Sequence, residues 1–393
     1  MKRLILFTVL LTLLAFVSAP QTHRAAAKVL DPMQAGPYPV GVTTTVLVDH
    51  SRKDAATNED RTLVTEIWYP ATDEARNLPK NKFSDFIPGG MTPQFETLLK
   101  MAYKKTAAEM NESYWNSAVR DARVRDGKFP LIVFSHGNGG TRTQNTFWCD
   151  YLASHGYVIV SADHTANARV TIINGKPVLY RNDQRENSAV DRPKDMSFLL
   201  DQMTLWNGGA DSRFSSKLDL SKPVASGMSF GSMTAIRVAD LDPRFKAVIA
   251  MSGAPESHTN LTVPSLYMLG EEDRTIGPKG NERVRDVYAK HQRDGYMLAI
   301  KDGGHYSFTD VFKIDKNFGD GVGKGKRGGE GAEFNYTSME TTYAIINSYS
   351  IAFLGLYVRG EREYLPFLQK NHWQKELDWD LKGVESGQTS GTK

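Results

Sequence analysis

The residue whose setting most clearly indicates chemistry is Ser229, in the pentapeptide Gly227-Met-Ser-Phe-Gly231. Residues 223–226 before it form a short, mostly apolar run, and residues 231–240 after it place small and apolar side chains at helical spacing. This pattern is typical of a nucleophile elbow, in which two glycines let a strained turn pass close to its neighbours and expose the serine hydroxyl. We therefore predict Ser229 as a nucleophile; the alternative is a turn serine without chemistry.

A serine hydroxyl becomes a good nucleophile only beside a base that an acid orients, and after such an elbow the chain order is serine, acid, histidine. Of nine histidines, four follow Ser229, and His305 is the one that follows a predicted strand through Asp-Gly-Gly. Ligands bind at the carboxyl ends of strands in open α/β sheets, so we predict His305 as the base, with a structural loop histidine as the alternative. The preceding strand ends in Gly-Glu-Glu-Asp, whose spacing favours Asp273 as the acid.

Acyl transfer also needs backbone N–H donors for the developing oxyanion, one just after the nucleophile and one from the loop after the third strand. Here these are the amides of Phe230 and of Asn138, which lies in the Gly-Asn-Gly-Gly sequence at residues 137–140. The small residues of this loop let a substrate carbonyl approach the backbone. Four further side chains are predicted as walls of the substrate pocket, with plain packing as the alternative: Trp148, His164, Tyr306 and Phe308.

Eight segments have the composition of strands. The first two, residues 41–48 and 61–69, are rich in Val, Thr and Ile and flank a polar stretch, which predicts an antiparallel pair. The later six are more continuously apolar and mostly alternate with helical patterns, which predicts a parallel block. The expected fold class is therefore α/β, with about eight strands in a mostly parallel sheet flanked by helices. The later strands are expected at residues 129–135, 157–162, 223–226, 246–251, 264–270 and 296–301.

One catalytic domain is expected over residues 36–366, because no change of composition resembles a linker. Before its third strand, residues 79–127 form a predicted helical insert, which is either a cap over the active site or a helix packed on the sheet edge. Residues 319–331 are expected to be a mobile, basic, glycine-rich loop beside His305. Residues 367–393 are expected to be a polar tail with a disordered end.

The N-terminus has Met-Lys-Arg followed by an apolar run of about 14 residues, which is typical of a secretory signal peptide. We expect this peptide to comprise residues 1–19, with a second candidate cleavage position at residue 27, and therefore predict a secreted or periplasmic protein. No later stretch contains 18 consecutive apolar residues, so no transmembrane segment is expected in the mature protein.

The charge balance and the cysteine content argue against several kinds of partner and site. Removing Lys2 and Arg3 from the 48 basic residues leaves 46, against 45 acidic residues, and this near balance argues against a nucleic-acid partner. The single Cys149 excludes an internal disulfide and a cysteine-rich zinc site. Neither His-Glu-x-x-His nor a phosphate-binding P-loop occurs, so neither a metal nor a cofactor is expected.

Six motifs occur in the order of one family: Gly-Pro-Tyr-Pro-Val-Gly at 36–41, Trp-Tyr-Pro at 68–70, Phe-Ser-His-Gly at 134–137, Leu-Ala-Ser-His-Gly-Tyr at 152–157, Gly-Met-Ser-Phe-Gly at 227–231 and Gly-His at 304–305. Over roughly residues 36–312 the chain resembles the platelet-activating-factor acetylhydrolase-like branch of the α/β-hydrolase superfamily. The resemblance implies the α/β-hydrolase fold. It also implies a metal-independent serine esterase that cleaves short or truncated acyl esters of small molecules or lipids.

The chain departs from that branch at the acid. In the animal enzymes the acid follows the sixth strand, where this chain has Ser252, whereas Asp273 follows the seventh, as in bacterial cutinase-like polyester hydrolases. The alternatives are therefore a cutinase-like polyester hydrolase or a lipase and, outside enzymes, a non-catalytic hydrolase-fold binding protein. The sequence leaves the acyl chain, the alcohol group and the oligomeric state open.

Overall fold

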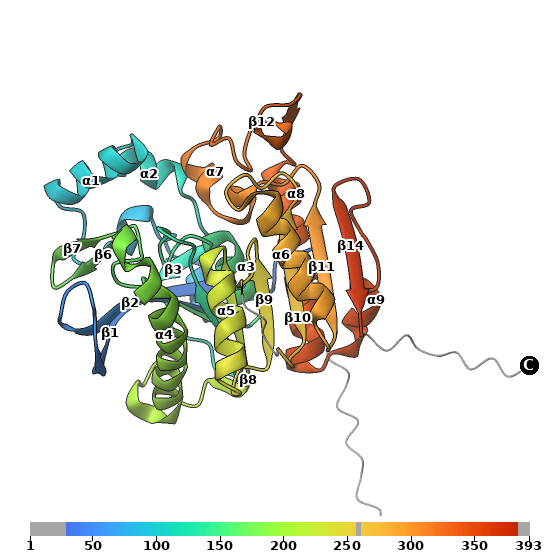
Figure 1. Ribbon diagram of the computed structural model, residues 1–393. Helices are drawn as coiled ribbons and strands as arrows, with labels where there is room; N and C mark the ends of the chain where they lie inside the picture. The colour runs from blue at the N-terminus through green and yellow to red at the C-terminus, as the bar shows by residue number, and fades with distance from the viewer. Residues whose placement is uncertain (1–28, 257–260, 384–393) are drawn as a thin grey trace, which may run out of the picture.

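The computed structural model describes residues 29–256 and 261–383 (Figure 1). The predicted signal peptide and the last ten residues of the predicted tail lie outside the described residues. Ten strands form one sheet, in the order β14-β11-β10-β9-β8-β4-β5-β2-β1-β3. The strands are β1 (Val40–Lys53), β2 (Asp60–Pro70), β3 (Ala118–Arg120), β4 (Phe129–Ser135), β5 (Val158–Ala162), β8 (Leu218–Met228), β9 (Ala247–Met251), β10 (Ser265–Gly270), β11 (Gly295–Ile300) and β14 (Leu377–Lys382).

The sheet has a parallel centre and mixed edges. From β11 to β5, all neighbouring strands are parallel. Beyond β5, strands β2 and β1 pair antiparallel, as the sequence predicts, and the short β3 runs parallel to β1. All seven residues of β4 and all five of β5 and of β9 are buried, because helices cover both faces of a parallel sheet.

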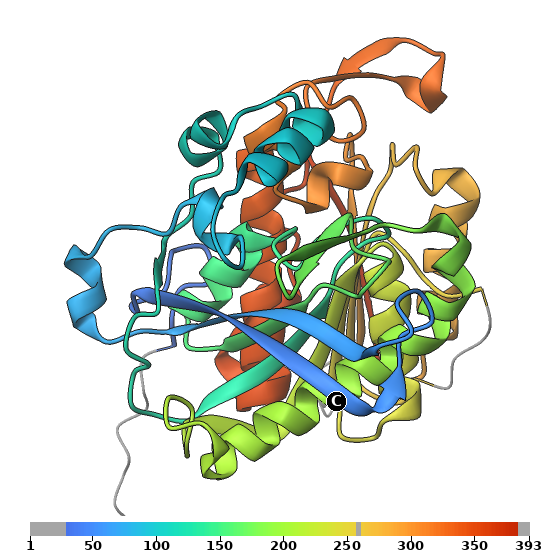
Figure 2. The same ribbon diagram turned by 90° about the vertical axis from the view of Figure 1, so that its left-hand side faces the viewer.

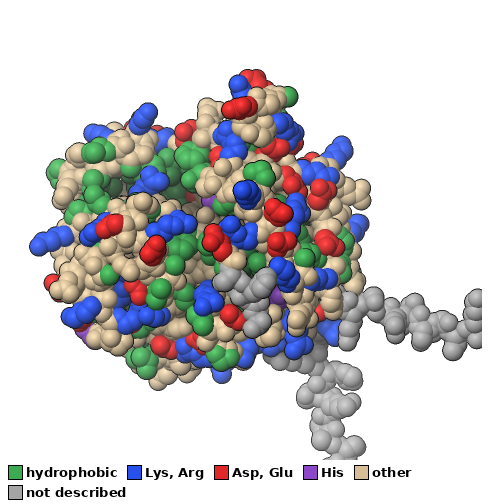
Figure 3. Space-filling view, in the orientation of Figure 1, with side chains coloured by type: hydrophobic (Ala, Val, Ile, Leu, Met, Phe, Trp, Pro, Cys, Tyr) green, Lys and Arg blue, Asp and Glu red, His purple; other side chains and the backbone are tan. Residues whose placement is uncertain are grey.

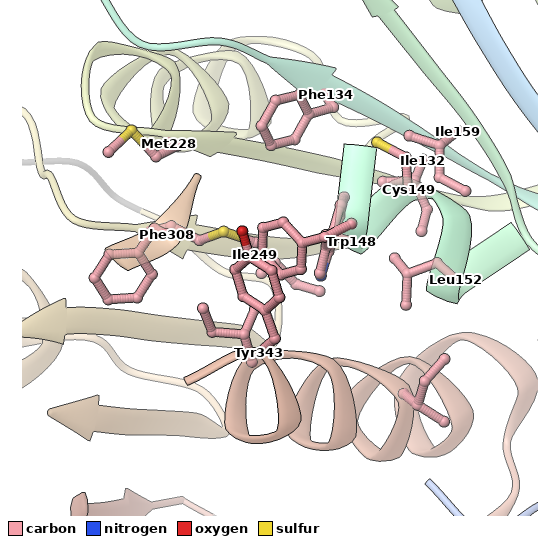
Figure 4. Close-up of a cluster of buried hydrophobic side chains, with 14 of the residues drawn as sticks. Ile132, Phe134, Trp148, Cys149, Leu152, Ile159, Met228, Ile249, Phe308 and Tyr343 are labelled. Atoms are coloured by element: carbon pink, nitrogen blue, oxygen red, sulfur yellow. The ribbon is translucent and has the colours of Figure 1, made fainter. Parts of the chain in front are cut away.

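Five helices form the two layers that cover the sheet. They are α3 (Thr146–Ser154), α4 (Arg185–Leu205), α5 (Phe230–Leu241), α6 (Gly277–Lys290) and α8 (Met339–Leu354). In Figure 1, α4, α5 and α6 lie on the near face of the sheet, and α3 and α8 lie behind it. Each layer has its own hydrophobic core against the sheet, so the parallel strands are fixed from both sides. Figure 4 shows the core beneath α3 and α8, into which Trp148 points from α3.

The predicted insert consists of short elements and not of one long helix. Helix α1 (Pro93–Tyr103) ends at Lys104, whose left-handed backbone (φ 54°) stops the helix. Helix α2 (Ala107–Ser113) then begins with a capping box, in which Thr106 and Glu109 satisfy each other's backbone amides. In Figures 1 and 2 both helices stand at the same end of the sheet as α7 (Val311–Ile314). The insert therefore contributes to the end of the sheet at which the parallel strands finish.

Two C-terminal segments differ from the expectation. Within the predicted polar tail, β14 (Leu377–Lys382) pairs antiparallel with β11 and forms the edge of the sheet. Its sequence alternates charged and apolar residues, because an edge strand has only one neighbour and exposes much of its surface. The predicted mobile loop at 319–331 contains β12 (Lys324–Lys326), which pairs with β13 (Glu333–Asn335) as a small hairpin. A second hairpin, β6 (Val170–Ile173) with β7 (Lys176–Leu179), faces α1 across the same end of the sheet.

Candidate active site

Ser229 lies at a strained turn between β8 and α5. Its backbone adopts φ 57° and ψ −119°, a conformation that a non-glycine residue holds only when its surroundings enforce it. The amide of Ser229 donates to the carbonyl oxygen of Met251 at 2.7 Å, which ties the turn to the end of β9. A Cβ atom on Gly227 or Gly231 would collide with the backbone of Ser135, so both positions require glycine. The strand and helix thus fix the position of the serine hydroxyl.

The side chains of Ser229, His305 and Asp273 form one chain of hydrogen bonds. His305 Nε2 lies 3.0 Å from Ser229 Oγ, and His305 Nδ1 lies 2.7 Å from Asp273 Oδ2. Both His305 and Asp273 are 3% exposed. With its Nδ1 proton directed at the carboxylate, His305 presents Nε2 as an acceptor for the serine proton. This arrangement suits a serine nucleophile with a histidine base and a carboxylate that orients the imidazole.

Asp273 has two further partners that hold its carboxylate in place. Ser252 Oγ donates to Asp273 Oδ2 at 2.5 Å and lies 3.3 Å from His305 Nδ1. The amide of Ile276 donates to Asp273 Oδ1 at 3.0 Å. Ser252 occupies the position after the sixth strand of the predicted order, and its hydroxyl reaches the acid that follows the next strand. The two loop ends are therefore joined at the carboxylate.

Asp320 connects the loop that carries Asp273 to the loop that carries His305. Its Oδ1 accepts from the amides of His305 at 3.0 Å and Arg274 at 3.3 Å, and its Oδ2 accepts from Thr275 Oγ1 at 2.8 Å. The backbone carbonyl of Asp320 accepts from the amide of Tyr306 at 2.9 Å. One buried carboxylate thus fixes the spacing of the two loops. The sequence gives no signal for this role, because Asp320 lies in a glycine-rich segment far along the chain from residue 274.

The predicted oxyanion donors come from two segments next to Ser229, the start of α5 and the loop at 137–140. Phe230 is the first residue of α5, and the amides of a helix's first turn have no acceptor within the helix. In the loop at 137–140 the amides of Gly137, Gly139 and Gly140 all donate within the protein. In the part of the chain that the structure describes, the Asn138 amide has no hydrogen-bond partner. The Asn138 side chain is held by Asn167 at 2.9 Å.

A cavity of about 300 Å³ opens above the serine. In Figure 3 it corresponds to the hollow at the top of the molecule between α1 and α7. Ser229 and His305 line it together with the 137–140 loop, and Tyr103 and Tyr114 of the insert form part of its wall. The insert therefore contributes directly to the space in which a substrate would meet the serine.

Of the four predicted pocket walls, Tyr306 lines this cavity and the other three do not. Trp148 and Phe308 are fully buried in the core of Figure 4, where the Trp148 indole donates to Ser350 Oγ at 3.0 Å. His164 lies beneath the 137–140 loop. The prediction is wrong for Trp148, His164 and Phe308, because proximity in sequence to a site loop does not determine on which side of the backbone a side chain lies.

Comparisons with known proteins give a consistent picture. The family described as platelet-activating factor acetylhydrolase, isoform II, matches residues 24–192, and the PET hydrolase-like family matches residues 121–314. The platelet-activating factor acetylhydrolase of Cavia porcellus is 23% identical over 389 residues, covering 89% of this chain and 81% of that protein. That of Bos taurus is 24% identical over 349 residues, covering 78% and 74%. These similarities support a platelet-activating-factor-acetylhydrolase-like α/β-hydrolase.

The fold comparison agrees with this assignment. The ferulic acid esterase from Streptomyces cinnamoneus has a TM-score of 0.63 and 24% identity to this chain, covering 82% of this chain and 91% of its own. The predicted α/β-hydrolase fold is thereby confirmed. The predicted enzyme class is confirmed as well: this α/β-hydrolase is a carboxylic ester hydrolase. Among the described residues, no helix is long and apolar enough to cross a membrane.

A buried cation, Arg192, lies beneath the 137–140 loop. Arg192 donates to Asn167 Oδ1 at 2.9 Å and to Ser135 Oγ at 2.7 Å, and it also bonds the carbonyl oxygen of His136. Its guanidinium lies 4.5 Å from the ring centroid of Phe230. Burial, partly offset by Asp195, lowers the pKa of Arg192 to about 9. Arg192 thus contacts both segments that carry the predicted oxyanion donors, a role that the sequence did not reveal.

His164 completes this lower layer. Its Nδ1 lies 2.8 Å from Asp195 Oδ2 and its Nε2 lies 2.8 Å from Ser135 Oγ. Burial, with the adjacent Arg192 charge, lowers the pKa of His164 to about 3, so the ring is neutral at neutral pH. Asp195 also pairs with Arg61 at 2.6 Å, and the pKa of its carboxyl falls well below the ordinary value despite burial. The carboxylate therefore remains charged, and the neutral imidazole connects it to Ser135 at the end of β4.

Proposed function

We propose that this chain hydrolyses carboxylic esters with short or truncated acyl groups through an acyl-serine intermediate. Ser229 is the nucleophile, His305 the base and then the acid, and Asp273 the orienting carboxylate. The amides of Phe230 and Asn138 form the oxyanion hole. The observation that carries the proposal is the continuous hydrogen-bond chain from Asp273 through His305 to Ser229, which ends at the floor of an open cavity.

Hydrolysis proceeds in two steps of acyl transfer. Ser229 Oγ attacks the ester carbonyl carbon while His305 Nε2 takes its proton, and the oxyanion accepts from the two amides. The carbon–oxygen bond to the alcohol then breaks, and the alcohol leaves with the proton from His305. A water molecule next gives a proton to His305 and attacks the acyl-serine. The carboxylic acid leaves, and the proton returns to Ser229 Oγ.

The proposed substrates are small-molecule or lipid esters, and the proposed location is outside the cytoplasm. The short acyl group is proposed from the similarity to platelet-activating factor acetylhydrolases, whose name specifies hydrolysis of an acetyl group. Export follows from the basic and apolar N-terminus of the sequence.

A polyester hydrolase is the second candidate, and one observation favours it. The PET hydrolase-like match covers residues 121–314 and so includes Ser229, Asp273 and His305, whereas the acetylhydrolase match ends at residue 192. Release of soluble acids from a solid aliphatic polyester film, at a rate comparable to that with soluble esters, would favour this candidate.

The experiment that tests the proposal is hydrolysis of 4-nitrophenyl acetate and butyrate by the wild type and by Ser229→Ala. We expect turnover in the wild type and a loss of at least about a thousandfold in the variant, because a triad without its nucleophile retains only binding and oxyanion contributions. Ser232→Ala, one turn along α5, is the matched control. Equal rates in wild type and Ser229→Ala would exclude the mechanism, and absence of turnover in both would favour a binding protein.

A further inference from the structure

A second cavity, of about 290 Å³, adjoins the one above Ser229. The two cavities share six lining residues, so they are neighbouring compartments of one continuous space. The shared residues are Phe83, Ala102, Tyr103, Thr141, Thr143 and Arg169. Helix α1 of the insert lies on one side of the second cavity, and the β6–β7 hairpin lies on the other.

The lining of the second cavity is mostly apolar. Leu98 and Leu99 face it from α1, Phe86 from the segment before that helix, and Ile172 and Leu179 from the hairpin. This composition differs from that of the cavity above Ser229, which is lined by Ser229, His305, Asp310 and the 137–140 loop. An apolar compartment next to a polar reaction centre separates the two ends of an amphiphilic molecule.

The one buried charge in the wall is neutralised. Arg142 pairs with Asp163 at 2.6 Å and Glu66 at 3.2 Å, and it also bonds the carbonyl oxygen of Phe86. Its hydrogen-bonding capacity is therefore used within the protein. Arg169, at the junction of the two cavities, is exposed and lies with its guanidinium 5.5 Å from the ring centroid of Tyr103. An uncharged chain can thus occupy the second cavity without removing water from an unpaired charge.

The mouth of the second cavity carries exposed apolar side chains. Met101 on α1 is 75% exposed and Leu179 on β7 is 50% exposed, and both line the cavity. Hydrophobic side chains, green in Figure 3, gather at the upper left of the molecule over α1 and around the adjacent hollow. Apolar side chains gathered around a concave entrance are typical of a site for an apolar ligand.

We propose that this second cavity, the insert cavity, binds an unbranched aliphatic chain of the ester whose carbonyl lies at Ser229. The proposal rests on the proposed esterase function and specifies its substrate class: an amphiphilic ester with one chain on the order of ten carbons. This length follows from the volume of 290 Å³ if each methylene takes about 30 Å³, as a water molecule does. The chain belongs either to the acid or to the alcohol, and the experiment distinguishes the two.

Two substrate series test the proposal. In 4-nitrophenyl esters of straight acids from two to fourteen carbons the chain is on the acyl side, and in alkyl acetates of the same lengths it is on the alcohol side. We expect kcat/KM to rise by about fourfold per methylene in one series, the effect of burying one CH2 group, and to level off on the order of ten carbons. Rates that stay flat or fall beyond four carbons in both series would overturn the proposal.

A cavity-filling variant locates the chain. Ile172→Trp places a larger side chain in the insert cavity and should shorten the length at which kcat/KM levels off by several carbons. Leu179→Asp, at the half-exposed mouth, should lower the preference for ten over two carbons by about tenfold even if the first variant does not fold. Leu205→Trp, on an exposed part of α4 that lines neither cavity, is the control. An unchanged levelling point in Ile172→Trp would place the chain elsewhere.

A binding measurement separates failure of this inference from failure of the proposed function. Titration of Ser229→Ala with 1-decanol and 1-butanol in a calorimeter requires no turnover. We expect decanol to bind at least about a hundredfold more tightly, and Ile172→Trp in the same background to remove most of the difference. If no ester is hydrolysed but decanol binds in this way, the cavity assignment stands without the esterase. Equal affinity for the two alcohols would overturn it.

Discussion

Two regions meet at the cavity above Ser229, and different forces hold them together. At the carboxyl ends of β8, β10 and β11 the side chains proposed for catalysis are fixed by short hydrogen bonds among buried polar groups, with Asp273 and Asp320 each accepting at least three. The wall formed by α1 and the β6–β7 hairpin consists mainly of apolar side chains. The hydrogen-bonded region fixes the positions of individual atoms, whereas the apolar wall encloses a space of a given volume.

This difference matches what each region has to do. Proton transfer between serine and histidine depends on a geometry that a shift of about 1 Å would disrupt, and buried hydrogen bonds are directional enough to maintain it. Binding an apolar chain depends on contact area, which many arrangements of side chains provide. We therefore expect substitutions at the polar edge to reduce kcat strongly and substitutions in the wall to change the preferred chain length.

The largest effect is expected at the acid of the polar edge. In Asp273→Asn the amide retains the size of the side chain but favours the wrong tautomer of His305, so kcat should fall by about a thousandfold to ten-thousandfold. Ser252→Ala removes one hydrogen bond to the same carboxylate, worth about 1 kcal/mol, and should lower kcat by about tenfold or less. Initial rates with 4-nitrophenyl butyrate measure both. A loss below tenfold in Asp273→Asn would assign the orienting role to another group.

A smaller effect is expected at the carboxylate that joins the two catalytic loops. Asp320→Ala leaves the amides of His305 and Arg274 without their acceptor, and we expect kcat to fall by about tenfold to a hundredfold while KM changes little. Asp320→Asn retains an acceptor oxygen and should recover part of this loss. The control is Arg327→Ala in the neighbouring hairpin, whose exposed pairs with Glu272 at 2.9 Å and Asp302 at 2.5 Å contribute little. Equal rates in Asp320→Ala and Arg327→Ala would show that Asp320 does not position the loops that carry Asp273 and His305.

The main features of the fold were predictable because each has a local signal. The continuous apolar strands, the glycines around Ser229 and the Asp-Gly-Gly before His305 all depend on residues next to one another in sequence. Because the parallel strands end at one edge, these separate segments were expected to meet, and the structure places Ser229, Asp273 and His305 within hydrogen-bond reach. Their catalytic roles stay predictions.

The features that were missed depend on contacts between distant segments or on side-chain direction. Asp320 reaches back to residue 274 from the glycine-rich segment before β12, and Arg192 reaches the carbonyl oxygen of His136 from the middle of α4; neither lies in a recognisable motif. Trp148 and Phe308 are adjacent to site loops in sequence, but their side chains lie in the core. Strand β14 has the polar composition of a tail, and only its pairing with β11 identifies it as part of the sheet.

The smallest effect concerns the stability of the polar region at low pH. Burial lowers the pKa of His164 to about 3, below the value of about 6.5 expected in the unfolded chain. As the pH falls below 6.5, the unfolded state therefore binds a proton that the folded state does not. The free energy of unfolding should then decrease by about 1.4 kcal/mol per pH unit down to about pH 3 from this residue alone.

Urea unfolding between pH 7 and pH 4 measures this slope. His164→Gln cannot titrate, so the free energy of unfolding of this variant should fall less steeply with decreasing pH, by the slope that one proton contributes. The variant should also be less stable than the wild type at pH 7, because it loses the link between Asp195 and Ser135. If His164→Gln and the wild type had the same slope, Asp195 would hold the imidazole protonated in the fold. The contact between His164 and Asp195 would then be an ion pair and not a hydrogen bond from a neutral imidazole.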